Sequence, residues 1–173
     1  MVKLIIIRGN SGSGKTTIAR KLQHELDDEG VLLIEQDIVR RQMLHVHDRP
    51  GNLAITLIAS LLSFGIEHCD FIILEGILNK NKYGEMLESI IKHEHVDTHT
   101  YYFDLPFEET VRRHHSKKDT DFGEAAMAKW FVEHDMLQVK GETCITQEMT
   151  EAQILRQILS DVKKTAKDKY KHR

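Results

Sequence analysis

One segment decides the fold of this chain: Gly9-Asn10-Ser11-Gly12-Ser13-Gly14-Lys15-Thr16. It follows apolar residues 4–7 and leads into residues 17–22, so it joins a predicted strand to a predicted helix. Its glycines allow backbone dihedrals that a side chain forbids, so several N–H groups can turn inward around a polyphosphate. Together with the N-terminal dipole of the following helix, these groups form an anion-binding site. The segment therefore predicts a phosphate-binding loop.

The end of this loop carries residues with chemical roles. Lys15 is placed to reach the β- and γ-phosphates of a nucleotide, and the hydroxyl of Thr16 is placed to bind Mg²⁺. Lys15 is accordingly also a candidate catalytic residue. The complete set of predicted nucleotide-binding residues in this region is Gly9, Asn10, Ser11, Gly12, Ser13, Gly14, Lys15, Thr16 and Thr17.

Length and composition suit one compact domain. The chain has 173 residues, of which 40% are hydrophobic, and we expect a single domain over residues 1–173. A net charge of −3 favours a small-molecule partner over nucleic acid, although a local basic channel is compatible with it. Two cysteines are too few for a disulfide framework. The first apolar run is too short for a signal peptide or a membrane span, so we expect a cytoplasmic protein.

Short apolar runs alternate with longer helical patterns along the chain. This alternation is typical of an α/β fold with a parallel sheet and helices on its faces. The predicted strands lie at 4–7, 31–34, 71–74, 100–103 and about 142–146. The predicted helices lie at about 15–28 and 37–44, around 54–62 and 83–91, from 106, around 127–131 and from 150, where Thr150 and Gln153 form a candidate capping box.

Asp37 follows the second predicted strand. Ligands of open α/β sheets bind beyond the carboxyl ends of the strands, so this carboxylate should face the phosphate loop. There it can orient a hydroxyl and accept its proton during phosphoryl transfer. Alternatively, Asp37 caps the helix that begins at residue 38. Arg40 and Arg41, one turn later, can bind a substrate anion or the transferred group, or lie on a solvated helix face.

Glu75 and Gly76 close the third predicted strand. A carboxylate there can hold a metal-bound water or a substrate hydroxyl, and glycine permits a close approach. The alternative interpretation is a solvated strand end.

A basic cluster follows the fourth predicted strand and contains Arg112, Arg113, Lys117 and Lys118. We predict a lid at about 112–123 that closes over ATP and neutralises the charge of the moving phosphoryl group. A solvated helix end is the alternative for each lysine. The arginines are the stronger candidates because one guanidinium can hold two phosphate oxygens.

Histidines and aromatic residues give weaker signals. The pairs at 45 and 47, 93 and 95, and 114 and 115 lack the spacing of a zinc site, so we expect the histidines mostly at the surface. Trp130 and Phe131 can wall a substrate pocket or stack on a base. At helical spacing with Met127, they are more typical of a core.

Four features in this order resemble the small P-loop kinases: the phosphate loop, Asp37-Ile38-Val39-Arg40, Leu74-Glu75-Gly76, and Phe103-Asp104-Leu105-Pro106-Phe107-Glu108-Glu109-Thr110. Within them, the chain is most similar to the group of zeta-toxin-like kinases, chloramphenicol phosphotransferase and phage-type polynucleotide kinase. The resemblance implies a three-layer α/β/α fold of the nucleoside-monophosphate-kinase type, with five parallel strands in the order 2-3-1-4-5. It also implies ATP with Mg²⁺ as phosphoryl donor and a hydroxyl group as acceptor.

The resemblance further implies roles for particular residues. Asp37 takes the position of the general base, and Arg40 that of the arginine that follows it. Glu75 takes the position of a glutamate that contacts substrate. Arg112 and Arg113 take the positions of lid arginines that contact phosphates, Arg112 as a nucleotide-binding residue and Arg113 as a catalytic one.

Three functions remain open at this stage. The leading one is a phosphotransferase that uses ATP to phosphorylate an alcohol group of a small molecule. The second is a kinase of 5′-hydroxyl polynucleotide or RNA ends, and the third is an ATPase or nucleotide-binding regulator without an acceptor. Guanine specificity is disfavoured, because the sequence Asn79-Lys80-Asn81-Lys82 lacks the aspartate of a guanine-binding motif.

Overall fold

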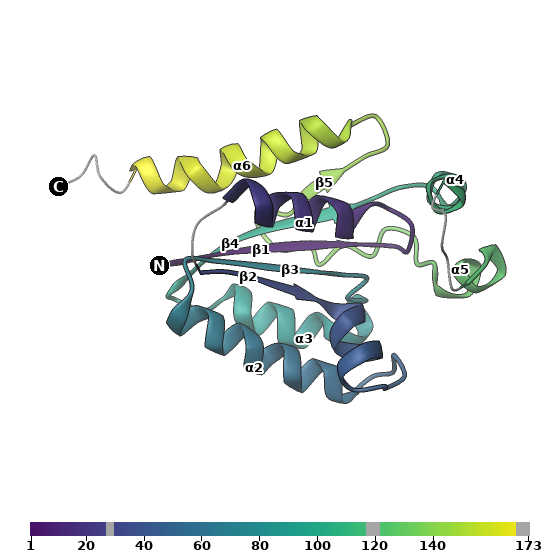
Figure 1. Cartoon of the computed structure of the whole chain (residues 1–173), viewed down its shortest axis with the longest axis horizontal. Coiled ribbons are helices and arrows are strands. Elements are labelled where there is room, and N and C mark those ends of the chain that lie inside the picture. Colours follow the sequence, from purple (N-terminus) through teal and green to yellow (C-terminus); the bar gives the residue numbers. More distant parts are fainter. Residues whose placement is uncertain (27–29, 117–121, 169–173) are drawn as a thin grey trace.

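The computed structural model describes residues 1–26, 30–116 and 122–168 and contains a five-stranded parallel sheet (Figure 1). The strand order is β2-β3-β1-β4-β5, which confirms the predicted order. The strands are β1 (Val2–Gly9), β2 (Val31–Glu35), β3 (Phe71–Gly76), β4 (Val96–Phe103) and β5 (Thr143–Ile145).

Helices cover both faces of this sheet (Figure 1). α1 and α6 lie over one face, and α2 and α3 lie over the other. The helices are α1 (Lys15–Leu26), the π-helix η1 (Ile38–Met43), α2 (Leu53–His68), α3 (Lys80–Ile91), α4 (Phe107–His115), α5 (Glu124–Trp130) and α6 (Glu151–Asp168). The three-layer α/β/α architecture is thereby confirmed.

β1 lies at the centre of the sheet and is buried along its whole length. Its side chains alternate between the two faces, because successive residues of a strand point to opposite sides. Leu4 and Ile6 join the core beneath α2 and α3, whereas Ile5 and Ile7 join the core beneath α1 and α6. Burial on both faces explains why the run is continuously apolar.

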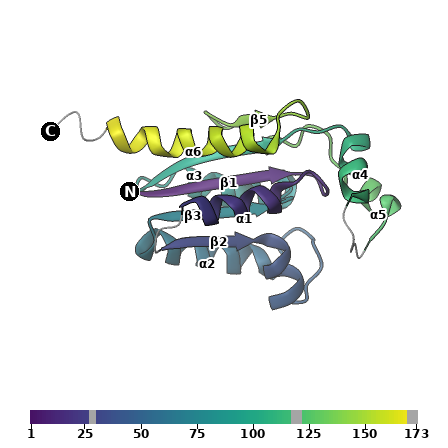
Figure 2. The ribbon, with the colours of Figure 1, turned by 45° about the horizontal axis from the view of Figure 1, so that its top comes forward.

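The parallel pairing aligns the carboxyl ends of the central strands. Ile7 pairs with Glu75, and Gly9 pairs with Phe103. The segments that follow β1, β3 and β4 therefore leave the sheet at the same edge, and α4 and α5 lie beyond that edge in both views (Figures 1 and 2). This edge carries the candidate site.

The capping box at the start of α6 is confirmed. The backbone N–H of Thr150 donates to Gln153 Oε1 at 2.8 Å, and the N–H of Gln153 donates to Thr150 Oγ1 at 3.3 Å. The predicted strand at about 142–146 is present as β5, and the predicted helix at 37–44 is present as η1. α1 is described as far as Leu26, so the predicted end at residue 28 lies outside the described residues.

The expectation that Trp130 belongs to the core was wrong. Met127 is buried, but Trp130 is 46% exposed. α5 lies beyond the edge of the sheet, so only one side of this short helix is covered (Figure 2). The indole instead meets Phe122 in an edge-on contact with ring centroids 5.0 Å apart.

Within the described part of the chain, no helix combines the length and the apolar composition that crossing a membrane requires.

Candidate active site

The phosphate loop connects β1 to α1 and is held tightly by its neighbours. Gly9 has φ 147° and Gly12 has φ 80°, backbone conformations that favour glycine. A Cβ atom on Gly12 would lie 2.5 Å from the carbonyl oxygen of Thr110, and one on Gly9 would lie 2.8 Å from Phe103 Cβ. The glycines therefore let β4 and α4 approach the loop closely.

Lys15 lies at the first position of α1, and its side chain is buried inside the loop. Its Nζ donates to the carbonyl oxygen of Asn10 at 2.7 Å and to Ser13 Oγ at 3.2 Å. The ammonium group is thus held where the loop backbone surrounds it.

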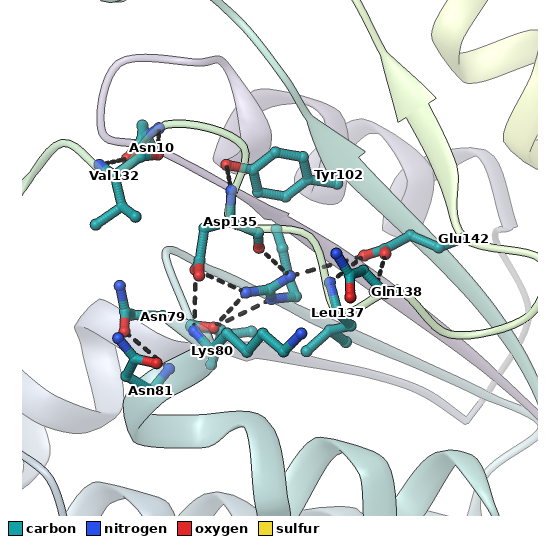
Figure 3. A network of polar contacts seen from close by, with 12 residues as sticks. Asn10, Asn79, Lys80, Asn81, Tyr102, Val132, Asp135, Leu137, Gln138 and Glu142 are labelled. Carbon is teal, nitrogen blue, oxygen red and sulfur yellow. Dashed lines mark hydrogen bonds and ion pairs between the residues drawn. The ribbon is translucent and has the colours of Figure 1, made fainter.

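Asn10 belongs to the same loop, but its side chain faces a distant segment. Its Nδ2 donates to the carbonyl oxygen of Val132 at 2.7 Å, and the N–H of Val132 donates to Asn10 Oδ1 at 3.0 Å (Figure 3). This double contact joins the loop to the chain that follows α5. No local pattern in the sequence indicates it, because the two residues are 122 positions apart.

The two arginines of α4 share one carboxylate. Glu109 accepts hydrogen bonds from Arg112 and Arg113, which hold the pKa of the Glu109 carboxyl at about 2. Arg113 also donates to the carbonyl oxygen of Ser13 at 3.0 Å, so its guanidinium lies against the phosphate loop. Arg112 is mostly exposed. Lys117 and Lys118 lie outside the described residues, as do residues 119–121 of the predicted lid.

A cavity of about 450 Å³ opens between this arginine pair and the chain before α6. Its lining includes Ser13, Thr17, Arg112, Arg113 and residues 147–151. The predictions from sequence missed the contribution of 147–151. The only signal there was the capping box, which indicated where α6 begins but not what the preceding turn faces.

Glu75 lies at the end of β3 and is buried beside the loop. Its Oε1 accepts a hydrogen bond from Thr16 Oγ1 at 3.1 Å. Burial raises the pKa of Glu75, and the nearby charges of Glu35 and Asp37 raise it further. The charge of Lys15 and the hydrogen bond from Thr16 lower the pKa of Glu75 and so oppose this shift. The Glu75 carboxyl group is thus held close to the loop cation and to other carboxyl groups.

Asp37 lies between β2 and η1, with a side chain that is 60% exposed. Its carboxylate makes no capping hydrogen bond to η1, so the capping interpretation is not supported. Instead, Asp37 Oδ1 accepts from Arg40 Nη2 at 3.0 Å. Arg40 also donates to the carbonyl oxygen of Val46 at 3.3 Å, whereas Arg41 lies on the exposed side of the same turn.

Gln36, which the sequence analysis did not single out, fixes the start of this turn. It is buried, and its Oε1 accepts from the N–H of Leu78 at 3.0 Å. A Cβ atom on Gly76 would collide with the side chain of Gln36. The glycine after Glu75 thus lets Gln36 join the ends of β2 and β3, which brings Asp37 and Glu75 to the same part of the edge.

Thr16 and Glu75 bring a hydroxyl and a carboxylate together beside the loop, and Asp37 lies near enough to Glu75 for their charges to interact. Hydroxyl and carboxylate oxygens are the ligands that Mg²⁺ prefers. Among the described residues, no three His, Cys, Asp or Glu side chains are grouped so that they alone hold a metal ion. An ion at this place would therefore also draw ligands from phosphate oxygens or water.

Most of the described histidines are exposed, as expected, and His114 is an exception. This residue is buried, and its Nε2 lies 2.8 Å from the carbonyl oxygen of Phe122. Its ring also stacks on that of Phe122, with centroids 4.8 Å apart. His114 therefore packs the junction of α4 and α5.

Comparison with known proteins identifies the family and the fold of the chain. A family model described as an AAA domain matches residues 4–138, so the chain belongs to that family. No curated protein matches the chain. Among solved structures, a gluconokinase from Sinorhizobium meliloti 1021 has a TM-score of 0.71 at 15% identity, with 97% of this chain and 95% of that chain covered.

Two further structures share the fold. The APS kinase CysC of Mycobacterium tuberculosis, in complex with AMPPNP and APS, has a TM-score of 0.62 at 14% identity, with 94% of this chain and 98% of that chain covered. A chain of the Pnkp1/Rnl/Hen1 complex has a TM-score of 0.50 at 24% identity, with 70% of this chain and 44% of that chain covered. The chain therefore has the fold of small P-loop kinases, which confirms the resemblance noted in its sequence.

Proposed function

We propose that this protein is an ATP-dependent kinase that transfers the γ-phosphoryl group of ATP·Mg²⁺ to a hydroxyl of a small molecule. The observation that carries this proposal is the hydrogen bond between Thr16 and Glu75 at the edge of the phosphate loop. It joins the last residue of the loop to a buried carboxylate, with Asp37 near enough to influence the pKa of that carboxylate. A loop that served only as a turn would not need this group of charges.

The nucleotide would occupy the phosphate loop and the adjoining cavity. The backbone of residues 9–14 would surround the phosphates, and Lys15 would neutralise their charge. The cavity lined by Thr17, Arg112 and residues 147–151 would take the nucleoside. Arg113 already lies against the loop at Ser13, which suits it to stabilise charge on the transferred group.

Mg²⁺ would be held by Thr16, with Glu75 as a ligand or as the acceptor for a metal-bound water. The ion would supply positive charge to the phosphate oxygens during transfer. The oxygen-rich donor set described above fits this ion.

The acceptor would be bound on the opposite side of the loop from the nucleoside. Asp37 would orient its hydroxyl and take the proton as the oxygen bonds to the γ-phosphorus and the bond to the bridging oxygen breaks, so that ADP leaves. Arg40 holds Asp37 through their hydrogen bond and can contact an anionic part of the acceptor, and Glu75 and Arg41 complete the proposed substrate-binding set.

We infer a single kinase domain over residues 1–173 with a lid around 112–123, acting in the cytoplasm. The described end of that lid, from Arg112 to Ser116, borders the nucleotide cavity, which supports a closing role.

The decisive experiment measures transfer of labelled phosphate from [γ-³²P]ATP·Mg²⁺ into a metabolite mixture and into a 5′-hydroxyl oligonucleotide. We expect the wild type to label a small molecule. Asp37→Asn should lose transfer by about 10²- to 10⁴-fold, the range for loss of a general base, while ATP affinity is retained. Asp70→Asn is the matched control, because Asp70 is exposed at the opposite edge of the sheet.

Other outcomes lead to other conclusions. Label in the oligonucleotide alone would identify a polynucleotide kinase. Inorganic phosphate released equally by the wild type and by Asp37→Asn would identify an ATPase and remove the proposed base.

A further inference from the structure

Residues 131–142, here called the strap, run from α5 to β5 (Figure 1) and contact Arg8 near the end of β1 and Tyr102 near the end of β4. Most of this segment has no regular structure, yet its backbone is bonded at many points. The N–H groups of Leu137 and Gln138 both donate to the carboxylate of Glu142. Beyond Phe131, the sequence indicated no role for the strap, and the proposed reaction uses none of its side chains.

Arg8 is a buried side chain that binds the strap through Asp135. It precedes Gly9 on β1, and its side chain is fully buried. The guanidinium donates twice to the carbonyl oxygen of Leu78, at 3.1 and 2.9 Å. It also donates to the carbonyl oxygen of Asp135 at 2.8 Å and to Asp135 Oδ2 at 2.9 Å. Burial lowers the pKa of Arg8, and the charges of Asp135 and Glu142 oppose this.

Asp135 connects the strap to two further elements. Its Oδ2 accepts from the backbone N–H of Lys80 at 2.9 Å, which places a carboxylate at the N-terminus of α3 (Figure 3). Its own N–H donates to the hydroxyl of Tyr102 on β4 at 2.9 Å. One residue therefore joins β1, β4 and α3.

The strap also contacts the phosphate loop. Val132 is bonded twice to the Asn10 side chain, and the Asn10 carbonyl oxygen accepts from Lys15 Nζ. Only three positions separate Val132 from Asp135, so the strap is a short physical link. This link connects the phosphate loop to the N-terminus of α3, the helix that follows β3.

We propose that Arg8 and Asp135 are a positioning pair that holds the strap, and through it fixes the phosphate loop relative to the N-terminus of α3. This inference rests on the proposed function. A buried ion pair is a weak source of stability compared with apolar residues of similar volume, because both charges lose their hydration. We therefore assign to this ion pair an effect on the relative position of the phosphate loop and α3, and not mainly an effect on stability.

The test measures Asp135→Asn, in which shape is kept and charge is lost. Two readouts are the Kd for mant-ATP with Mg²⁺ and the rate of ATP hydrolysis without acceptor, both at a temperature where circular dichroism shows folded protein. We expect the Kd to rise about tenfold, typical of residues coupled within one network. His134→Gln is the matched control, because this exposed strap residue pairs with Asp104 and not with the loop or α3.

A double-mutant cycle separates positioning from simple stabilisation. If the strap acts as one unit, Asn10→Ala combined with Asp135→Asn raises the Kd about as much as either change alone, since each breaks the same link. Additive effects would overturn the inference. So would an Asp135→Asn protein that binds mant-ATP like His134→Gln.

Two measurements remain informative if Asp135→Asn does not fold. Tyr102→Phe removes only the hydroxyl that accepts from Asp135, and should weaken mant-ATP binding about threefold. In the wild type, MgADP should slow hydrogen exchange in peptides from 76–82 and from 131–142, and unchanged exchange there would refute the coupling. A wild type that binds no nucleotide would overturn both the proposed function and this inference.

Discussion

At the scale of single residues, the site depends on a buried carboxylate next to a buried ammonium. Glu75 accepts from Thr16, and its raised pKa reflects burial that the charge of Lys15 only partly offsets. A positive ion placed beside this carboxylate would favour its ionised form. Glu75 should therefore matter more for metal binding than for binding the nucleoside.

Changing Glu75 to Gln tests this assignment. The amide keeps the size of the side chain and removes its charge, so the Mg²⁺ concentration for half-maximal activity should rise about 10- to 100-fold, the range for groups that orient metal ligands. This Mg²⁺ concentration is measured by titrating the activity with Mg²⁺ at saturating ATP. Glu67→Gln, on the exposed side of α2, should leave the titration unchanged. An identical Mg²⁺ dependence in both variants would contradict the assigned role.

At the scale of elements, the phosphate loop owes its shape to β4 and α4 as much as to its own residues. The carbonyl oxygen of Thr110 and the methyl group of Met127 occupy the space that a side chain on Gly12 would need. Arg113, which lies on α4 like Thr110, donates a hydrogen bond to the carbonyl oxygen of Ser13 in the loop. A movement of α4 would therefore be transmitted to the loop, which is the behaviour expected of the element that begins a lid.

Gly12→Ala should weaken nucleotide binding and lower the melting temperature. Gly51→Ala is an informative control, because Gly51 also has positive φ but has no atom within 4 Å of an added Cβ. Both variants incur a backbone cost of about 1–2 kcal/mol. Only Gly12→Ala also pushes α4 away from the loop, so mant-ATP affinity should fall in that variant alone. Equal affinities would show that the close approach of α4 is dispensable.

At the scale of the whole molecule, ionisable groups are also partly or fully buried away from the candidate site. Far from the site, His99 of β4 is largely buried near Asp97, Lys3 and Asp161. Burial lowers the pKa of His99, although Asp97 and Asp161 oppose the shift. The folded protein therefore binds a proton at His99 less readily than the unfolded chain does.

This difference predicts a pH dependence of stability. Because the unfolded chain takes up the proton at a pKa of about 6.5, the free energy of unfolding should fall as pH drops below that value. His99→Gln should reduce the slope of the unfolding free energy against pH by up to about 1.4 kcal/mol per pH unit, measured by urea titrations between pH 7 and pH 5. Asp104 raises the pKa of His134 in the folded state, so protonation of His134 favours folding at low pH. His134→Gln should therefore make the slope of the unfolding free energy against pH steeper. A slope that His99→Gln leaves unchanged would refute the prediction.

Much of this molecule could be predicted because its signals are local. The glycine spacing and the Lys15-Thr16 pair indicated the phosphate loop, and apolar runs indicated the strands. The positions of Asp37 and Glu75 at strand ends followed from the rule that parallel strands finish at one edge. Trp130 was misjudged because helical spacing does not reveal whether a neighbouring element covers a given side of the helix.

Local chemistry in the sequence determined the loop, the parallel sheet and the kinds of group available at its edge, because glycine conformations and hydrophobic periodicity act over a few residues. Only the tertiary structure decided that Asn10 binds Val132, that residues 147–151 border the cavity beside Arg112 and Arg113, and that Arg8 and Asp135 are paired. These contacts join residues far apart in the chain. They exist because the order of the strands and the packing of the helices bring those residues together, which no short pattern encodes.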